Sequence, residues 1–265
     1  MKKLFDKALI LFKNNLLVNF FLRAETWSEK IGLICLYIAM PVLGVIVCIS
    51  QDRAIHSMYA EPVLIALGFA VVSILFGYIA DKMLEYVRPS ISQAKTNIVN
   101  GAFFDVLAVF MLLITVCCVI GANIMLFNGE FTGMVTTIVG GVLALYFAVM
   151  LLSPEKMLNV HVQESATPAQ SLIAISALLI KAAYRLVPFA FGAMMVICVV
   201  NGIDLAACKE YSFAYRLSDF IEIFLTSAML PLIGYFLFLA YYFVLDLCMS
   251  VFRIADAVES KNKSK

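Results

Sequence analysis

The sequence predicts an all-α protein: a polytopic transmembrane helical bundle of six spans, preceded by an N-terminal amphipathic interfacial helix. Of the 265 residues, 63% are hydrophobic and only 14% are charged, whereas a soluble domain is about 45–50% apolar and about 25% charged. Six uncharged stretches have the ~20 residues needed to cross a hydrocarbon core ~30 Å thick. This composition excludes a soluble enzyme, a nucleic-acid-binding domain, a disordered chain and a disulfide-stapled secreted domain.

Residues 1–30 are predicted to form a cytoplasmic amphipathic or interfacial segment rather than a cleavable signal peptide. Lys13 interrupts the apolar run, and no small-residue cleavage site follows. One helical stripe is polar and the opposite face is apolar, which favours a helix lying on lipid with its lysines toward anionic headgroups. A docking helix for another subunit is the alternative. The polar stripe comprises Lys3, Asp6, Lys7, Lys13 and Asn14.

Residues 31–251 are predicted to form the transmembrane domain, followed by a basic cytoplasmic tail over 252–265. Apolar runs of this length without strict alternation indicate helices rather than barrel strands. The tight turn Asn128-Gly129-Glu130 predicts an antiparallel hairpin of the third and fourth spans. The spans are expected at about 31–50, 62–80, 103–127, 131–152, 183–203 and 221–248.

The segment 168–180 is a further apolar stretch between the fourth and fifth predicted spans. It follows an N-cap threonine and begins with Pro168 at the first helical position. Its uncharged run is short for a span, and Lys181 and Arg185 separate it from the fifth span. We therefore expect an interfacial or re-entrant helix, with a seventh span as the alternative.

The distribution of basic residues predicts the orientation. With six spans, all but three of the 19 lysines and arginines fall on one side of the membrane. Cytoplasmic segments carry this excess, so both termini are expected in the cytoplasm, in a bacterial cytoplasmic (inner) membrane. The three exceptions are Arg53, Lys209 and Arg216.

Four ionisable residues lie at the ends of predicted spans: Asp105, Asp246, Lys181 and Arg185. An ionisable group inside a membrane is by default a functional hypothesis. One interpretation is an interfacial pairing that fixes the rotation of the helices. The other is a proton or cation relay through Asp105 and Asp246. The first is favoured because the middle of every predicted span lacks charge.

Prolines and glycines within the spans indicate kinks and close packing. Proline removes a backbone hydrogen bond, so Pro41, Pro188 and Pro231 are candidate kinks. Small residues let the backbones of membrane helices approach each other. The candidate packing positions are Gly133, Gly140, Gly141, Gly68 and Gly77.

The sequence shows no catalytic, cofactor-binding or metal-binding motif. His56 and His161 lack acidic or thiol neighbours, and neither HExxH, GxSxG nor a nucleotide-binding loop occurs. We therefore expect no enzyme activity, cofactor or metal. The spacing leaves open whether Cys48 and Cys208 are joined by a disulfide.

Two functional classes remain. The favoured one is a non-enzymatic polytopic inner-membrane subunit or scaffold of a larger secretion, transport or energy-coupling assembly. The alternative is a small solute or ion transporter or channel, alone or as a homo-oligomer, that uses Asp105 and Asp246. The expected partners are membrane lipids and other membrane-protein subunits or a second copy, and no nucleic acid.

Overall fold

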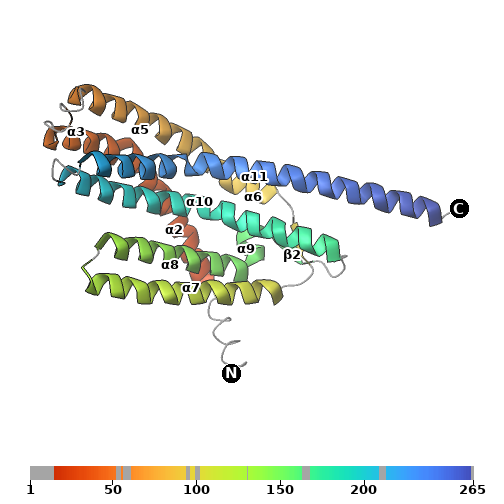
Figure 1. The fold of residues 1–265 in the computed structure, drawn as a ribbon. Helices are drawn as coiled ribbons and strands as arrows, with labels where there is room; N and C mark the ends of the chain where they lie inside the picture. The colour runs from red at the N-terminus through yellow and green to blue at the C-terminus, as the bar shows by residue number, and fades with distance from the viewer. Residues whose placement is uncertain are drawn as a thin grey trace.

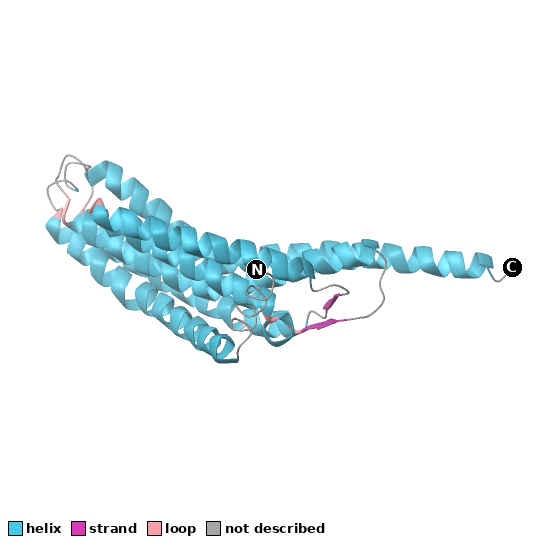
Figure 2. Cartoon of the chain, turned by 90° about the horizontal axis from the view of Figure 1, so that it is seen from below, coloured by secondary structure: helices cyan, strands magenta, loops and turns pink. Residues whose placement is uncertain are grey.

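The computed structural model describes residues 15–51, 55, 61–93, 96–98, 102–129, 131–162, 168–208 and 213–263, and these residues form an elongated helical bundle (Figures 1 and 2). The helices are α2 (Asn15–Ile34), η1 (Cys35–Ala39), α3 (Met40–Ser50), α5 (Pro62–Glu85), α6 (Val87–Gln93), α7 (Ala102–Phe127), α8 (Phe131–Leu152), α9 (Pro154–Leu158), α10 (Pro168–Ala206) and α11 (Phe213–Lys263). Two three-residue strands, β1 (Thr96–Ile98) and β2 (Val160–Val162), pair in parallel.

Six helical segments are long and apolar enough to cross a membrane, one for each predicted span. The prediction of an all-α integral membrane protein with six spans is therefore confirmed. The segments are Leu17–Ser50, Pro62–Ser92, Phe104–Phe127, Gly133–Leu152, Ile173–Ala206 and Phe213–Ser250.

The helical chain that contains the first predicted span also includes part of the predicted interfacial segment. Residues 15–30 belong to α2, and the helical chain continues from α2 through η1 and α3 to Ser50. The amphipathic stripe predicted over residues 3–14 lies outside the described residues. In Figure 1, α2 runs obliquely behind α8 and α10 before α3 takes up the direction of the bundle.

The change of direction between α2 and α3 coincides with the candidate kink at Pro41. The wide turn η1 precedes this proline, and the N–H of Met40 bonds to the carbonyl of Cys35, five residues back. Proline offers no N–H to the preceding turn, and such π-type turns are one of the recognised causes of bends in helices. Pro188 and Pro231 lie inside α10 and α11.

The segment 168–180 also differs from the expectation. It is the first part of α10, a single helix of 39 residues that continues through Lys181 and Arg185 to Ala206. The two cations do not end the helix because their side chains find acceptors inside the protein, as described below. Helix α11 is longer still, with 51 residues, and its C-terminal part projects beyond the other helices (Figure 1).

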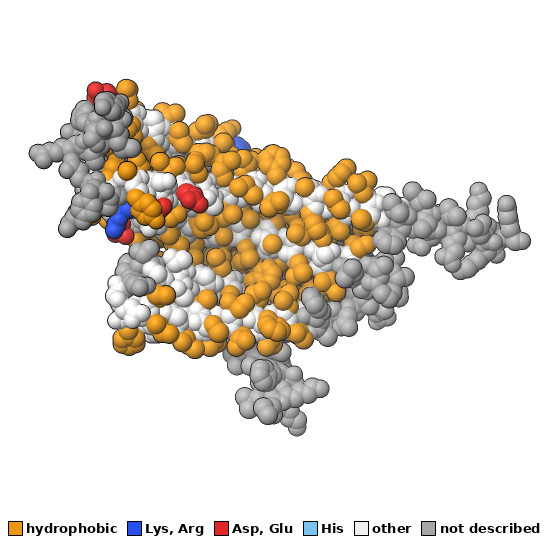
Figure 3. Space-filling model, viewed as in Figure 1, with side chains coloured by type: hydrophobic (Ala, Val, Ile, Leu, Met, Phe, Trp, Pro, Cys, Tyr) orange, Lys and Arg blue, Asp and Glu red, His pale blue; other side chains and the backbone are white. Residues whose placement is uncertain are grey.

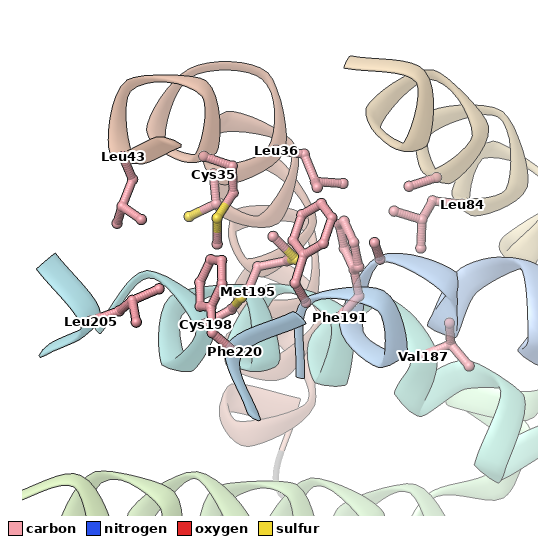
Figure 4. Close-up of a cluster of buried hydrophobic side chains, with 14 of the residues drawn as sticks. Cys35, Leu36, Leu43, Leu84, Val187, Phe191, Met195, Cys198, Leu205 and Phe220 are labelled. Carbon is pink, nitrogen blue, oxygen red and sulfur yellow. The ribbon is translucent and has the colours of Figure 1, made fainter. Parts of the chain in front are cut away.

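Buried side chains form two clusters that share α10. One joins α3, α5, α10 and α11, and contains Leu36, Phe191 and Met195 (Figure 4). The other joins α2, α7, α8, α9 and the first half of α10, and contains Phe21, Tyr146 and Leu178. Helix α7 packs chiefly against α8, at one edge of the bundle (Figure 1).

The candidate packing glycines differ in their surroundings. A Cβ at Gly77 would lie 2.8 Å from the ring of Tyr37, and one at Gly141 would lie 3.0 Å from the Cβ of Cys118. Open space surrounds Gly68 and Gly140. The carbonyl of Gly133 accepts a hydrogen bond from the Thr137 hydroxyl at 2.8 Å. Glycine therefore permits close packing at Gly77 and Gly141, on α5 and α8.

Candidate functional site

A fully buried carboxylate, Glu25 of α2, lies at the centre of a cluster of polar side chains. The Tyr146 hydroxyl of α8 donates to Glu25 Oε2 at 2.8 Å, and Arg185 Nη2 of α10 donates to the same oxygen at 3.3 Å. Arg88 Nε of α6 donates to the other oxygen, Oε1, at 3.2 Å. One carboxylate thus connects four helices.

Arg88 carries the cluster toward the surface. Its Nη2 lies 3.9 Å from Glu29 Oε2, one turn beyond Glu25 on α2. The Arg88 side chain is 48% exposed, compared with 11% for Arg185. The two arginines therefore hold Glu25 from opposite environments, one from the protein interior and one from the edge of the bundle.

The two cations of α10 also bind the end of the short helix α9. Lys181 is fully buried, and its Nζ donates to the carbonyl of Leu158 at 3.3 Å. Arg185, one turn later, donates through Nη1 to the carbonyl of Met157. The last carbonyls of a helix have no partner within it and carry partial negative charge. Lys181 and Arg185 therefore satisfy the end of α9.

The cluster lies within the apolar part of the bundle. Tyr146 is fifteen residues from the start of α8 and six from its end, which at 1.5 Å per residue is about 23 Å and about 9 Å. Tyr146 is itself fully buried, and its hydroxyl touches Glu25. An ionised carboxylate at this depth is costly unless it is paired and hydrogen-bonded, and the two arginines and the tyrosine provide that pairing.

The sequence of α2 places Glu25 at this position. Its buried residues follow the three- and four-residue spacing of one helical face, and they comprise Val18, Phe21, Glu25 and Gly32. The ring of Phe21 stacks on the ring of Tyr146, with centroids 4.9 Å apart and planes 17° apart. This stacking orients the tyrosine hydroxyl toward the carboxylate one turn further along α2.

A close crossing of α2 and α10 completes the arrangement. Gly192 faces the backbone carbonyl of Ser28 so closely that a Cβ there would overlap it. The Ser28 hydroxyl donates to the carbonyl of Phe189 at 3.0 Å. Because α10 presents no side chain at position 192, α2 can approach it, and this approach brings Glu25 within reach of Arg185.

The structure brings together two of the four predicted charged residues, Lys181 and Arg185. Asp105 lies in the first turn of α7 and is partly buried, whereas Asp246 is exposed on α11. Helix α11 packs against α10 and α5, and α8 and α10 lie between it and α7 (Figure 1). The structure therefore does not bring Asp105 and Asp246 together.

The sequence reasoning missed Glu25 because it placed residues 1–30 outside the bilayer. The available signal was the position of Glu25 on the apolar stripe of α2, where a solvated acid would be out of register. Tyr146 and Arg88 also escaped notice, since neither an uncharged tyrosine inside a span nor an arginine after one is unusual.

The described residues contain no group of three or more His, Cys, Asp or Glu side chains that could hold a metal ion. Cys48 and Cys208 are both free thiols in this structure. The bonds of the cluster are ion pairs and hydrogen bonds between helices.

No protein-family model, curated protein or solved structure matches this chain. The fold and the cluster accordingly define its class: an all-α integral membrane protein with six spans and a buried, hydrogen-bonded ion cluster where α2, α8 and α10 meet.

Proposed function

We propose that this protein is a non-enzymatic scaffold subunit of a larger membrane assembly. The observation that carries the proposal is that the ion cluster bonds helices of this protein to one another. Both oxygens of Glu25 are bonded, and Lys181 and Arg185 donate to backbone carbonyls of α9. The Nε atom of Arg185 is buried without a hydrogen-bond partner. The bonds that the cluster does make hold helices in place, whereas an ion or proton path needs polar groups that line a cavity.

The cavities of the molecule support the same proposal. Two cavities formed by described residues lie where α10 ends and α11 begins, and none of the cluster residues lines either of them. An ion path using Asp105 and Asp246 would in addition have to cross α8 and α10, which lie between α7 and α11 (Figure 1).

A surface suited to partner subunits is the outer face of α7. This helix packs chiefly against α8, and only 11% of its most apolar 18-residue stretch is buried inside the protein. Apolar side chains cover much of the molecular face seen in Figure 3. The exposed apolar residues of α7 are Val106, Phe110, Leu113, Ile114, Val116, Val119, Ile120, Ile124, Leu126 and Phe127.

The proposal is tested by extracting the tagged full-length protein in mild detergent and measuring the native mass of what co-purifies. We expect a complex with other membrane proteins in fixed stoichiometry. A lone monomer or homo-oligomer that conducts ions or solutes in liposomes would overturn the proposal and favour a transporter.

The face of α7 is tested by site-specific photo-crosslinking in the native membrane. A photoreactive residue at Ile120 of α7 is compared with one at Leu67 of α5, because the two side chains are 56% and 58% exposed. We expect a discrete protein adduct at Ile120 and lipid adducts alone at Leu67. Lipid adducts alone at both positions would show that no partner covers α7.

We further propose a bacterial cytoplasmic membrane with both termini in the cytoplasm, which places the Glu25 cluster in the cytoplasmic half of the bilayer. The excess of lysine and arginine on that side supports this orientation. In a variant whose sole cysteine is Cys208, an impermeant thiol reagent should label intact cells. Labelling that requires a broken membrane would reverse the orientation.

A further inference from the structure

An apolar cavity of about 330 Å³ lies between α3, α5 and α11, near the end of α10. Most of its wall is buried, whereas Ile65 of α5 and Ile221 of α11 are 43% and 42% exposed. Leu43 and Leu205, which line it, flank one end of the apolar cluster in Figure 4. The exposed pair marks a side of the cavity that faces the membrane between two spanning helices.

A second cavity, of about 260 Å³, adjoins the first and shares Leu205 and Phe220 with it. Its lining combines apolar side chains with three charged ones, Asp204 from α10 and Arg216 and Asp219 from the start of α11. Basic and acidic side chains occur together at this end of the bundle in Figure 3. The apolar cavity thus shares part of its wall with a cavity lined by side chains of both charge signs.

We propose that the two cavities together bind one zwitterionic phospholipid. A segment of one acyl chain fills the apolar cavity, whose volume lies at the lower end of the roughly 300–1,000 Å³ range of ligand sites. The guanidinium of Arg216 binds the lipid phosphate. The carboxylates of Asp204 and Asp219 bind its ammonium group through charge-assisted hydrogen bonds.

The balance of charge selects the headgroup. Two carboxylates against one guanidinium give the polar cavity an excess of one negative charge, which repels a headgroup that carries only a phosphate. A zwitterionic headgroup instead supplies a cation for the carboxylates and an anion for the arginine. We therefore expect discrimination against anionic lipids with the same acyl chains.

The test is native mass spectrometry of the full-length protein in detergent, with equimolar phosphatidylethanolamine and phosphatidylglycerol carrying identical acyl chains. We expect one phosphatidylethanolamine to be retained at least several-fold over phosphatidylglycerol. Equal retention of the two lipids would overturn the proposal.

The acyl-chain cavity is tested with Ala66→Leu, since the buried Ala66 lines it. Ala70→Leu is the matched control, one turn further along α5 and outside the lining. We expect retention to fall at least several-fold in the first variant and to stay unchanged in the second. Equal retention by both variants would overturn the assignment of the cavity.

The headgroup contacts are tested at exposed positions, where substitution leaves the core intact. In Asp219→Asn the preference for phosphatidylethanolamine should fall close to one, because the polar cavity then loses its negative excess. In Arg216→Gln retention of phosphatidylethanolamine should fall several-fold. An unchanged preference in Asp219→Asn, or unchanged retention of phosphatidylethanolamine in Arg216→Gln, would overturn the assignment of the polar cavity.

Discussion

The two buried regions of this protein hold helices together by different means. The charged core comprises Glu25, Arg88, Tyr146, Lys181 and Arg185, and it joins α2, α6, α8, α9 and α10 through directional bonds. The apolar core, where α3, α5, α10 and α11 meet, is held by packed side chains such as the stacked rings of Tyr184 and Phe238, whose centroids are 4.3 Å apart. Both cores use the same helix, α10.

The difference shows how specificity arises where lipid replaces water. Lipid tails are as apolar as leucine, so apolar helices gain little from the hydrophobic effect and depend on shape. A buried ion pair contributes little net stability, but separating its partners leaves an uncompensated charge. The charged core thus penalises every arrangement in which α2 fails to meet α10, while the apolar core tolerates repacking.

The largest effect is expected when the charged core loses one partner. Arg185→Met leaves Glu25 with Arg88 and Tyr146 alone and leaves the Met157 carbonyl without its donor. Removing one member of a buried pair costs about 3–5 kcal/mol. We expect a lower midpoint of thermal unfolding, measured by circular dichroism of the protein in detergent. Arg23→Met, at an exposed position of α2, should leave the midpoint unchanged.

A double variant distinguishes the charge interaction between Glu25 and Arg185 from the packing of their side chains. Glu25→Gln with Arg185→Met removes both charges of this pair, while the half-exposed Arg88 keeps Glu29 as a partner. We expect the double variant to lose less stability than the sum of the two single variants. Strict additivity would show that Glu25 and Arg185 are not coupled.

The next effect is expected at the helix crossing that brings the ion pair together. In Gly192→Ala the new methyl group meets the backbone of Ser28, which cannot rotate away. Overpacking of this kind costs about 1–3 kcal/mol, and we expect a corresponding fall in the unfolding midpoint. Gly140→Ala is the control because open space surrounds Gly140, and it should be neutral or slightly stabilising. Equal effects of the two substitutions would contradict the close crossing.

These variants also show which parts of the structure the sequence could predict. The number of spans follows from apolar length, a local property that each segment displays by itself. Lys181 and Arg185 stood out because charge next to an apolar run is costly wherever it lies. Their acceptors did not stand out, since the carbonyls of Met157 and Leu158 belong to the backbone and carry no sequence signal.

The crossing of α2 and α10 was equally hidden. Gly192 differs from Gly140 in its surroundings. The backbone of Ser28, 164 residues away in the chain, faces Gly192, whereas open space surrounds Gly140. The spacing of Gly68, Gly77, Gly133, Gly140 and Gly141 therefore could not distinguish the positions that need a glycine from those that only contain one.

A smaller effect is expected from the hydroxyl that completes the charged core. Tyr146→Phe keeps the stacking on Phe21 and removes one hydrogen bond to Glu25, a type of bond worth about 1.5–3 kcal/mol. We expect a loss at the lower end of this range, because both arginines still hold the carboxylate. Tyr78→Phe, at a 58% exposed position of α5, should not shift the unfolding midpoint. If the Tyr146→Phe protein were as stable as this control, the Tyr146 hydroxyl would contribute no stabilising hydrogen bond to Glu25.

The smallest effect is expected in the apolar core. Leu36 is fully buried there, and Leu36→Met conserves its volume while adding flexibility. Swaps of this kind usually cost less than about 1.5 kcal/mol. We expect a clearly smaller fall in the unfolding midpoint than for Arg185→Met, although both variants introduce the same residue. If the two variants were equally unstable, shape would constrain the apolar core as strictly as charge constrains the other, and the contrast between the two cores would disappear.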